Sequence, residues 1–223
     1  MRFNDYIIII GTGIIVIAFL AIIYFSKKYT VPYYLKYFYW FPIIGLIVSS
    51  NSILWTFFHL YNGRIFHLVQ DILTLLWFII LFVFFIRVLK PYKHIKVFII
   101  YGYIITGIQF VLIIYVYINQ IRLPVQSIFS IIIIPLCLVY YRRLLKLKPI
   151  DNLFQSPPFW IITGIFFYTC VAFIVYNLSI FLPHSSLPNS IRSFVYSFGN
   201  ISAIVLYFLI IKAYTCLKHP QNS

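Results

Sequence analysis

The chain has 223 residues, of which 63% are hydrophobic, 22% aromatic and 9% charged. Soluble globular proteins contain about 25% charged residues, so this composition excludes a water-soluble domain. The 17 Lys and Arg residues against 3 Asp and Glu would normally suggest nucleic-acid binding. Here they cluster between apolar stretches of about 20 residues, the length needed to cross a bilayer, which predicts an all-α polytopic membrane protein that does not bind nucleic acid.

Seven apolar stretches follow one another along the chain, and each is expected to form a transmembrane helix of a single helix bundle covering residues 1–223. Their continuous apolar character is unlike the alternating strands of a membrane β-barrel. The first stretch lacks a strongly basic leader and a small-residue cleavage site, so we expect it to be retained. The predicted spans are residues 6–25, 34–60, 65–86, 97–118, 124–141, 159–182 and 191–216.

The distribution of basic residues predicts the orientation of the bundle. Basic loops resist translocation, and one set of helix ends holds only Arg2, Arg64, Arg122 and Arg192, while the other set holds the remaining Lys and Arg residues. We therefore expect the N-terminus outside and the C-terminus in the cytoplasm, in a bacterial cytoplasmic (inner) membrane. The cytoplasmic loops at 87–96 and 142–148 are expected to contact anionic lipid or a partner protein.

Five polar side chains inside the predicted spans form the candidate site. Asp71 is the one acid within a span, and His67 lies one helical turn earlier, on the same helix face. At 1.5 Å per residue, Asp71 lies roughly 9 Å below the outer end of its span, and Asn51, Gln109 and Asn200 lie roughly 13 Å below theirs. All five are therefore expected in the outer half of the bundle.

Two explanations for these polar side chains remain open at the level of sequence. They can act as structural contacts, with amides bonding across helices at about 0.6 to 2 kcal/mol each and Asp71 neutral or paired with His67. Alternatively, they can line a pocket open to the outside that binds a small ligand or ion, or changes protonation.

Several chemical functions are not expected. The other two acids, Asp5 and Asp151, are isolated, and the chain has no HExxH motif, serine elbow or glycine-rich phosphate loop. We therefore predict no enzymatic activity and no cofactor. Lys212 lies roughly 31 Å from the outer end of the last span, too deep to bind retinal at mid-membrane. His59, His67 and Asp71 form no recognised ligand spacing, so no metal site is predicted.

A sequence pattern around the sixth span resembles a known group of proteins. The chain reads Pro-Phe-Trp-Ile-x-x-Gly-x-x-x-Tyr from Pro158 to Tyr168, closes the second span with Phe-His-Leu-Tyr-Asn at 58–62, and places Tyr-Arg-Arg-Leu-Leu at 141–145. In these features it resembles a family of small seven-helix membrane proteins of Bacteroidota that lack an assigned function. It is also similar to the membrane portion of some sensor histidine kinases of that group, which implies a sensory role.

Independently of this resemblance, the residues of the stretch have a physical interpretation. Pro157 and Pro158 suit the first turn of a helix, Trp160 suits the membrane interface, and Gly164 permits close helix packing.

Two functions are therefore expected. The first is a sensory or regulatory membrane module that depends on a separate histidine kinase or regulator, because the sequence contains no transmitter domain. The second is a small solute or ion transporter that uses the outer polar pocket.

Overall fold

The computed structural model describes residues 3–36, 38–54, 63–90, 95–119, 125–146, 153–181 and 189–218. These residues form helices and no strands, and six of the helices are long and apolar enough to cross a membrane. The prediction of an all-α, multi-pass membrane protein is confirmed at this level. The helices are α1 (Phe3–Lys28), α2 (Trp40–Ile53), α3 (Gly63–Leu89), α4 (Ile95–Asn119), α5 (Val125–Lys146), α6 (Pro157–Phe181) and α7 (Asn189–Thr215), with short 3-10 turns η1 (Tyr33–Leu35), η3 (Leu153–Gln155) and η4 (Cys216–Lys218).

The predicted spans agree with the helices to within three residues except at two ends. We expected the second span to begin at 34, but α2 begins at Trp40 after the separate turn η1. Proline lacks a backbone N–H and is tolerated in the first helical turn, and this start places Pro42 there. Residues 55–60 of this predicted span lie outside the described residues. At the other exception, α5 continues to Lys146 instead of ending at 141.

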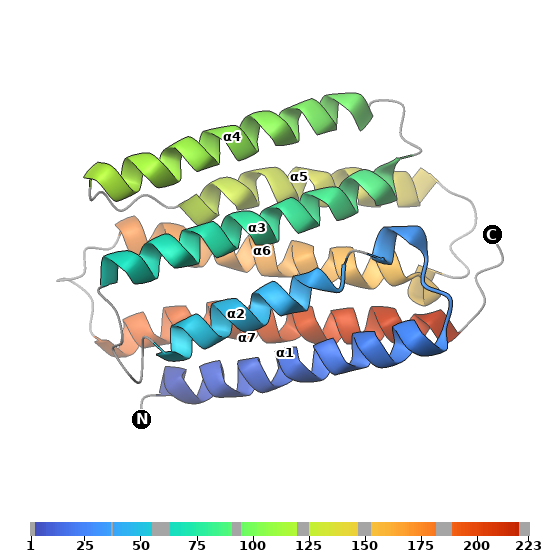
Figure 1. The fold of residues 1–223 in the computed structure, drawn as a ribbon, viewed down its shortest axis with the longest axis horizontal. Helices are drawn as coiled ribbons and strands as arrows, with labels where there is room; N and C mark the ends of the chain where they lie inside the picture. Colours follow the sequence, from blue (N-terminus) through green and yellow to red (C-terminus); the bar gives the residue numbers. More distant parts are fainter. Residues whose placement is uncertain are drawn as a thin grey trace.

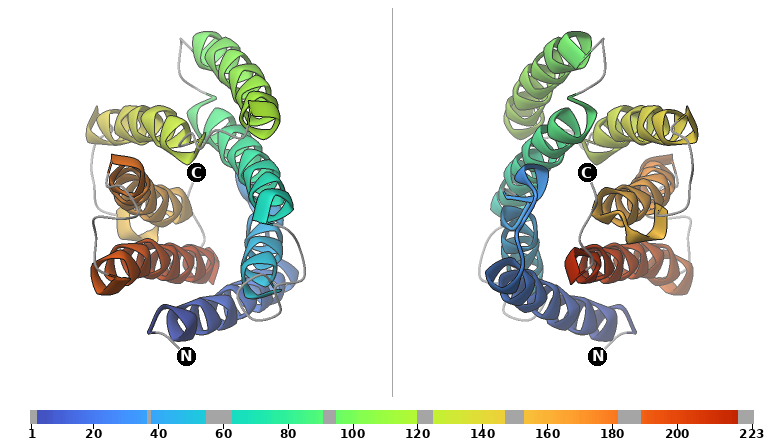
Figure 2. Two further views of the ribbon diagram at one scale, coloured as in Figure 1. Left: turned by 90° about the vertical axis from the view of Figure 1, so that its left-hand side faces the viewer. Right: turned by 90° about the vertical axis from the view of Figure 1, so that its right-hand side faces the viewer.

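Helices α1, α2, α3, α5, α6 and α7 contact one another in a ring, which the views along the bundle show (Figure 2). Helices α1, α2 and α3 pack in sequence along one wall, and α5, α6 and α7 form the facing wall. Contacts between α1 and α7 close the ring on one side, and contacts between α3 and α5 close it on the other. Successive helices run in opposite directions (Figure 1), so the N-terminal ends of α1, α3, α5 and α7 lie together.

Helix α4 lies outside this ring and packs mainly on α3 (Figures 1 and 2). The two helices approach closely at Gly102, where a Cβ atom would overlap the ring of Phe82. Much of the rest of α4 is apolar and exposed, including Val97, Tyr103 and Ile118. In a bilayer, this surface would face lipid.

The two ends of the ring differ in packing. At the end formed by the C-terminal halves of α1, α3 and α7, buried side chains fill the interior, and η1 contributes the fully buried Leu35. Phe38 stacks on Phe41 with ring centroids 4.8 Å apart and contacts Phe84 at 4.9 Å. This aromatic cluster closes the bundle at that end.

Basic side chains gather at the same closed end. The guanidinium of Arg143 donates a hydrogen bond to the backbone carbonyl of Val88 at 3.1 Å, which joins α5 to α3. Arg87 lies over the ring of Tyr33, 4.6 Å from its centroid. Cations near a helix C-terminus interact favourably with its dipole, which explains why α5 extends as a helix through its basic residues.

Candidate functional site

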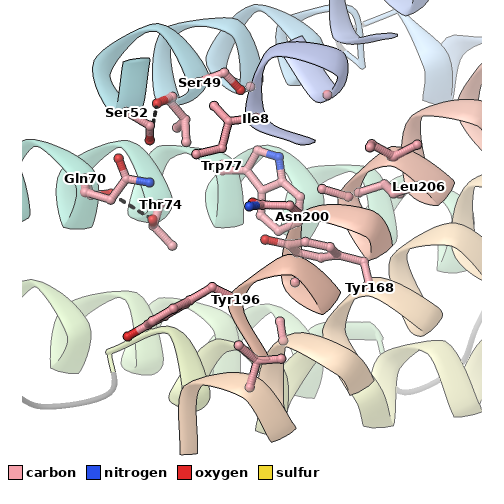
Figure 3. Close-up of a pocket in the computed structure, with 18 of the residues that line it drawn as sticks. Ile8, Ser49, Ser52, Gln70, Thr74, Trp77, Tyr168, Tyr196, Asn200 and Leu206 are labelled. Atoms are coloured by element: carbon pink, nitrogen blue, oxygen red, sulfur yellow. Dashed lines mark hydrogen bonds between the residues drawn. The ribbon is translucent and has the colours of Figure 1, made fainter. Parts of the chain in front are cut away.

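The half of the ring opposite the aromatic cluster contains a cavity of about 610 Å³. Every helix of the ring contributes to its lining, and none of the described side chains of α4 does so. Figure 3 shows the space between side chains from α1, α2, α3, α6 and α7. A cavity of this size is typical of sites for small organic molecules.

One face of α3 provides more polar side chains to the lining than any other helix does. His67, Gln70, Asp71, Thr74 and Trp77 all line the cavity, and their spacing of three or four residues places them along one side of a helix. The hydroxyl of Thr74 donates to the backbone carbonyl of Gln70 at 2.7 Å, and the side chain of Gln70 lines the cavity.

The structure brings three of the five predicted site residues to this cavity. Asp71, His67 and Asn200 line it directly, the last from α7. The Asp71 carboxylate interacts electrostatically with Tyr176 of α6, which also lines the cavity. His67 is exposed and contacts the ring of Phe66 edge-on at 5.3 Å.

Asn51 lies behind the cavity wall. Its side chain is buried, with 7% of its surface exposed, and it is not among the lining residues. Its Nδ2 donates to Oε1 of Gln70 at 3.4 Å, which links α2 to α3. Asn51 therefore acts as a contact between helices that positions a residue of the cavity.

Gln109 lies away from the cavity, because it belongs to α4 outside the ring. Its side chain is completely buried, and neither its Nε2 nor its Oε1 has a hydrogen-bond partner among the described residues. The predicted depth of Gln109 along its helix is similar to that of the other four residues. Because α4 packs outside the ring, however, its side chain does not reach the cavity.

The cavity has an aromatic floor that the sequence did not point to. Trp77 contacts Tyr168 edge-on, with ring centroids 5.3 Å apart, and Tyr207 lines the same region. Below them, Phe41 lies 4.7 Å from Trp77 and 5.9 Å from Tyr207. Trp77 could have been found from its position, since it follows His67 and Asp71 on the same face of α3.

The sixth span packs as its sequence predicted. Helix α6 begins at Pro157, and Trp160 donates from its Nε1 to the backbone carbonyl of Phe154 at 2.7 Å. A Cβ atom at Gly164 would lie 3.3 Å from Cβ of Leu209 on α7. The close contact at Gly164 holds together the two helices that carry Tyr168 and Asn200.

No group of three His, Cys, Asp or Glu side chains among the described residues could hold a metal ion. His59, which we considered as a ligand with His67 and Asp71, lies outside the described residues.

Replacing Gln109 with leucine should increase the free energy of unfolding by about 1 to 3 kcal/mol, because it removes a buried amide that lacks hydrogen bonds among the described residues. The matched variant Asn51→Leu should instead lower it by about 1 kcal/mol, because Gln70 loses a donor. Denaturant titration of the purified protein in micelles measures both. Equal changes in the two variants would contradict the different environments of these amides.

Comparison with protein-family models, curated proteins and solved structures finds no match to this chain.

Proposed function

We propose that this chain is a small-molecule-binding sensory module of a bacterial inner membrane. The observation that carries the proposal is the cavity of about 610 Å³, which is lined by all six ring helices and lies against an aromatic floor. A ligand bound there would contact both walls of the ring at once. It could therefore change how α6 and α7 sit against α2 and α3, which is the kind of change that a partner protein can detect.

The proposal includes seven spans, with the cavity facing outside. The described basic side chains at the closed end support this orientation through the positive-inside rule, and they offer contacts to anionic lipid headgroups. They are Lys27, Lys28, Lys36, Arg87, Lys90, Lys96, Arg142, Arg143, Lys146 and Lys212. The resemblance to membrane portions of sensor kinases of Bacteroidota supports a separate histidine kinase or regulator as the partner.

A transporter of a small solute or ion is the second candidate. Its support is the position of the cavity, which lies in one half of the bundle with aromatic rings between it and the other half. Many transporters bind their substrate between broken helices, whereas α1 and α3 to α7 are continuous over the residues that the structure describes. This continuity favours the sensory module. We propose no enzymatic activity for either function.

The proposal is tested by blocking the cavity. Ala203 lines it from α7, so Ala203→Trp should abolish the rise in unfolding temperature that small-metabolite mixtures cause in the native protein. Ile201 on the same helix is 42% exposed and does not line the cavity, so Ile201→Trp should respond like the native protein. Equal stabilisation of both variants by the same ligand would contradict binding in this cavity.

The same ligand then separates the two functions. For a sensory module we expect saturable binding without net uptake into liposomes that contain the purified protein, and co-purification with a kinase or regulator from native membranes. Ligand accumulation inside the liposomes that Ala203→Trp abolishes would establish the transporter instead.

A further inference from the structure

We infer that the cavity binds a small organic amine, with its ammonium group at Asp71 and its apolar body on the aromatic floor of Trp77, Tyr168 and Tyr207. This inference rests on the proposed function of the cavity as a ligand site. It adds the charge and the shape of the ligand.

The charges around the cavity favour a cation. Asp71 is the single carboxylate among the described lining residues, and none of these residues is Lys or Arg. The described basic side chains of the helix ends lie at the closed end of the bundle, away from the cavity. A carboxylate in a low-dielectric site is stabilised by a cation, and an ammonium ligand would supply one.

The groups near Asp71 are suited to an ammonium group. Each N–H of an ammonium needs a hydrogen-bond acceptor, and oxygen atoms line the neighbouring walls. The amide oxygen of Gln70 comes from α3 and keeps a second lone pair beside the one used by Asn51. Hydroxyls come from Ser49 and Ser52 on α2. The hydroxyl of Ser52 donates to the carbonyl of Val48 at 3.0 Å, so its lone pairs remain able to accept.

The floor of the cavity is suited to an apolar or aromatic body. Trp77 and Tyr168 meet edge-on at 5.3 Å, and Leu206 and Ile15 complete this part of the lining. Trp77 lies six residues after Asp71 on α3, which is a rise of roughly 9 Å. A molecule that spans this distance, with an amine at one end and a ring at the other, satisfies both regions.

Other ligand classes fit less well. An anion would meet the Asp71 carboxylate without a described Lys or Arg in the lining to offset the repulsion. A metal ion would leave most of the cavity of about 610 Å³ unfilled, and the described residues offer no cluster of three ligands. A neutral molecule would leave the carboxylate with His67, one helical turn away on α3, as the single basic side chain among the described lining residues.

The test uses three probes of similar shape and different charge: phenethylamine, 2-phenylethanol and 3-phenylpropanoate. Calorimetric titration of the purified native protein in nanodiscs should show that the amine binds at least tenfold more tightly than the alcohol, with the carboxylate weakest. Tryptamine, which has a larger ring, should bind at least as tightly as phenethylamine, because the floor is aromatic.

The variant Asp71→Asn should lower the affinity for phenethylamine at least tenfold and leave the affinity for 2-phenylethanol unchanged. Two matched control variants each replace an uncharged polar side chain and leave the Asp71 carboxylate in place. Thr74→Val changes the same wall of the cavity, and Gln109→Leu changes a buried amide outside it. Both should retain the preference for the amine.

Equal affinities of the native protein for the amine and the alcohol would overturn the inference, even if Asp71→Asn does not fold. Retention of full amine affinity by Asp71→Asn would also overturn it, as would failure of every amine to bind. A different result refutes the proposed function: no ligand of any charge raises the unfolding temperature of Ile201→Trp more than that of Ala203→Trp. If a neutral ligand binds and Ala203→Trp blocks its binding, the inference of an amine ligand is refuted. The proposed ligand-binding function of the cavity is then kept.

Discussion

Replacing Gly164 with leucine should lower the free energy of unfolding by about 3 kcal/mol, the upper part of the range for overpacking a well-packed site. A Cβ atom at this position would lie 3.0 Å from Cδ1 and 3.4 Å from Cα of Leu206, and 3.3 Å from Cβ of Leu209. Because two of these atoms belong to or adjoin the backbone of α7, a rotamer change cannot make room. The helices α6 and α7 must separate.

The matched control is Gly107→Leu on α4, where an added Cβ atom would meet nothing within 4 Å. Both substitutions add the same side chain to a helix, so they share the change in helix propensity. Denaturant titration in micelles should show a large loss for the first and little change for the second. Similar stabilities of the two variants would show that α6 and α7 are not held at this contact.

The second large effect is expected at Phe41, at the centre of the aromatic cluster. Its ring is completely buried and lies within 6 Å of the rings of Phe38, Trp77 and Tyr207. Truncation to alanine should cost about 3 to 5 kcal/mol, because it leaves a cavity that these rings cannot fill. Phe41→Leu keeps most of the volume and should cost less.

The Phe41 experiment also reports on the binding site, because Trp77 and Tyr207 line the cavity above this ring. We expect Phe41→Ala to weaken ligand binding even at temperatures where the protein remains folded. Tyr103→Ala on α4 is the control, since this side chain is 74% exposed. Thermal unfolding and calorimetric titration of the two variants should differ clearly. If Phe41→Ala changed neither the stability nor the ligand affinity, the aromatic cluster would not be what closes the bundle at this end.

The two explanations for the intramembrane polar residues apply to different residues. Asn51 is a structural contact, because its amide is used by Gln70. Asp71 and Asn200 line a cavity. Sequence could not separate the two groups, because the cost of a polar group in hydrocarbon is the same whether a neighbouring helix or a cavity satisfies it.

Hydropathy alone determined the all-α membrane fold and most helix limits of this protein. A bilayer requires long apolar segments with every backbone group bonded internally. Such segments can be recognised from runs of neighbouring residues alone. The face of α3 that carries His67 and Asp71 could also be predicted, since it depends only on helical periodicity. The small residue Gly164 indicated close packing for a similarly local reason.

Only the tertiary structure decided which helices surround the cavity. All the spans are strongly apolar, so their sequences do not state which side faces lipid and which faces another helix. The exclusion of α4 from the ring, which removes Gln109 from the site, therefore depends on how the helices pack together. The aromatic floor has the same origin, because Trp77, Tyr168 and Tyr207 come from three helices that meet only in the folded bundle.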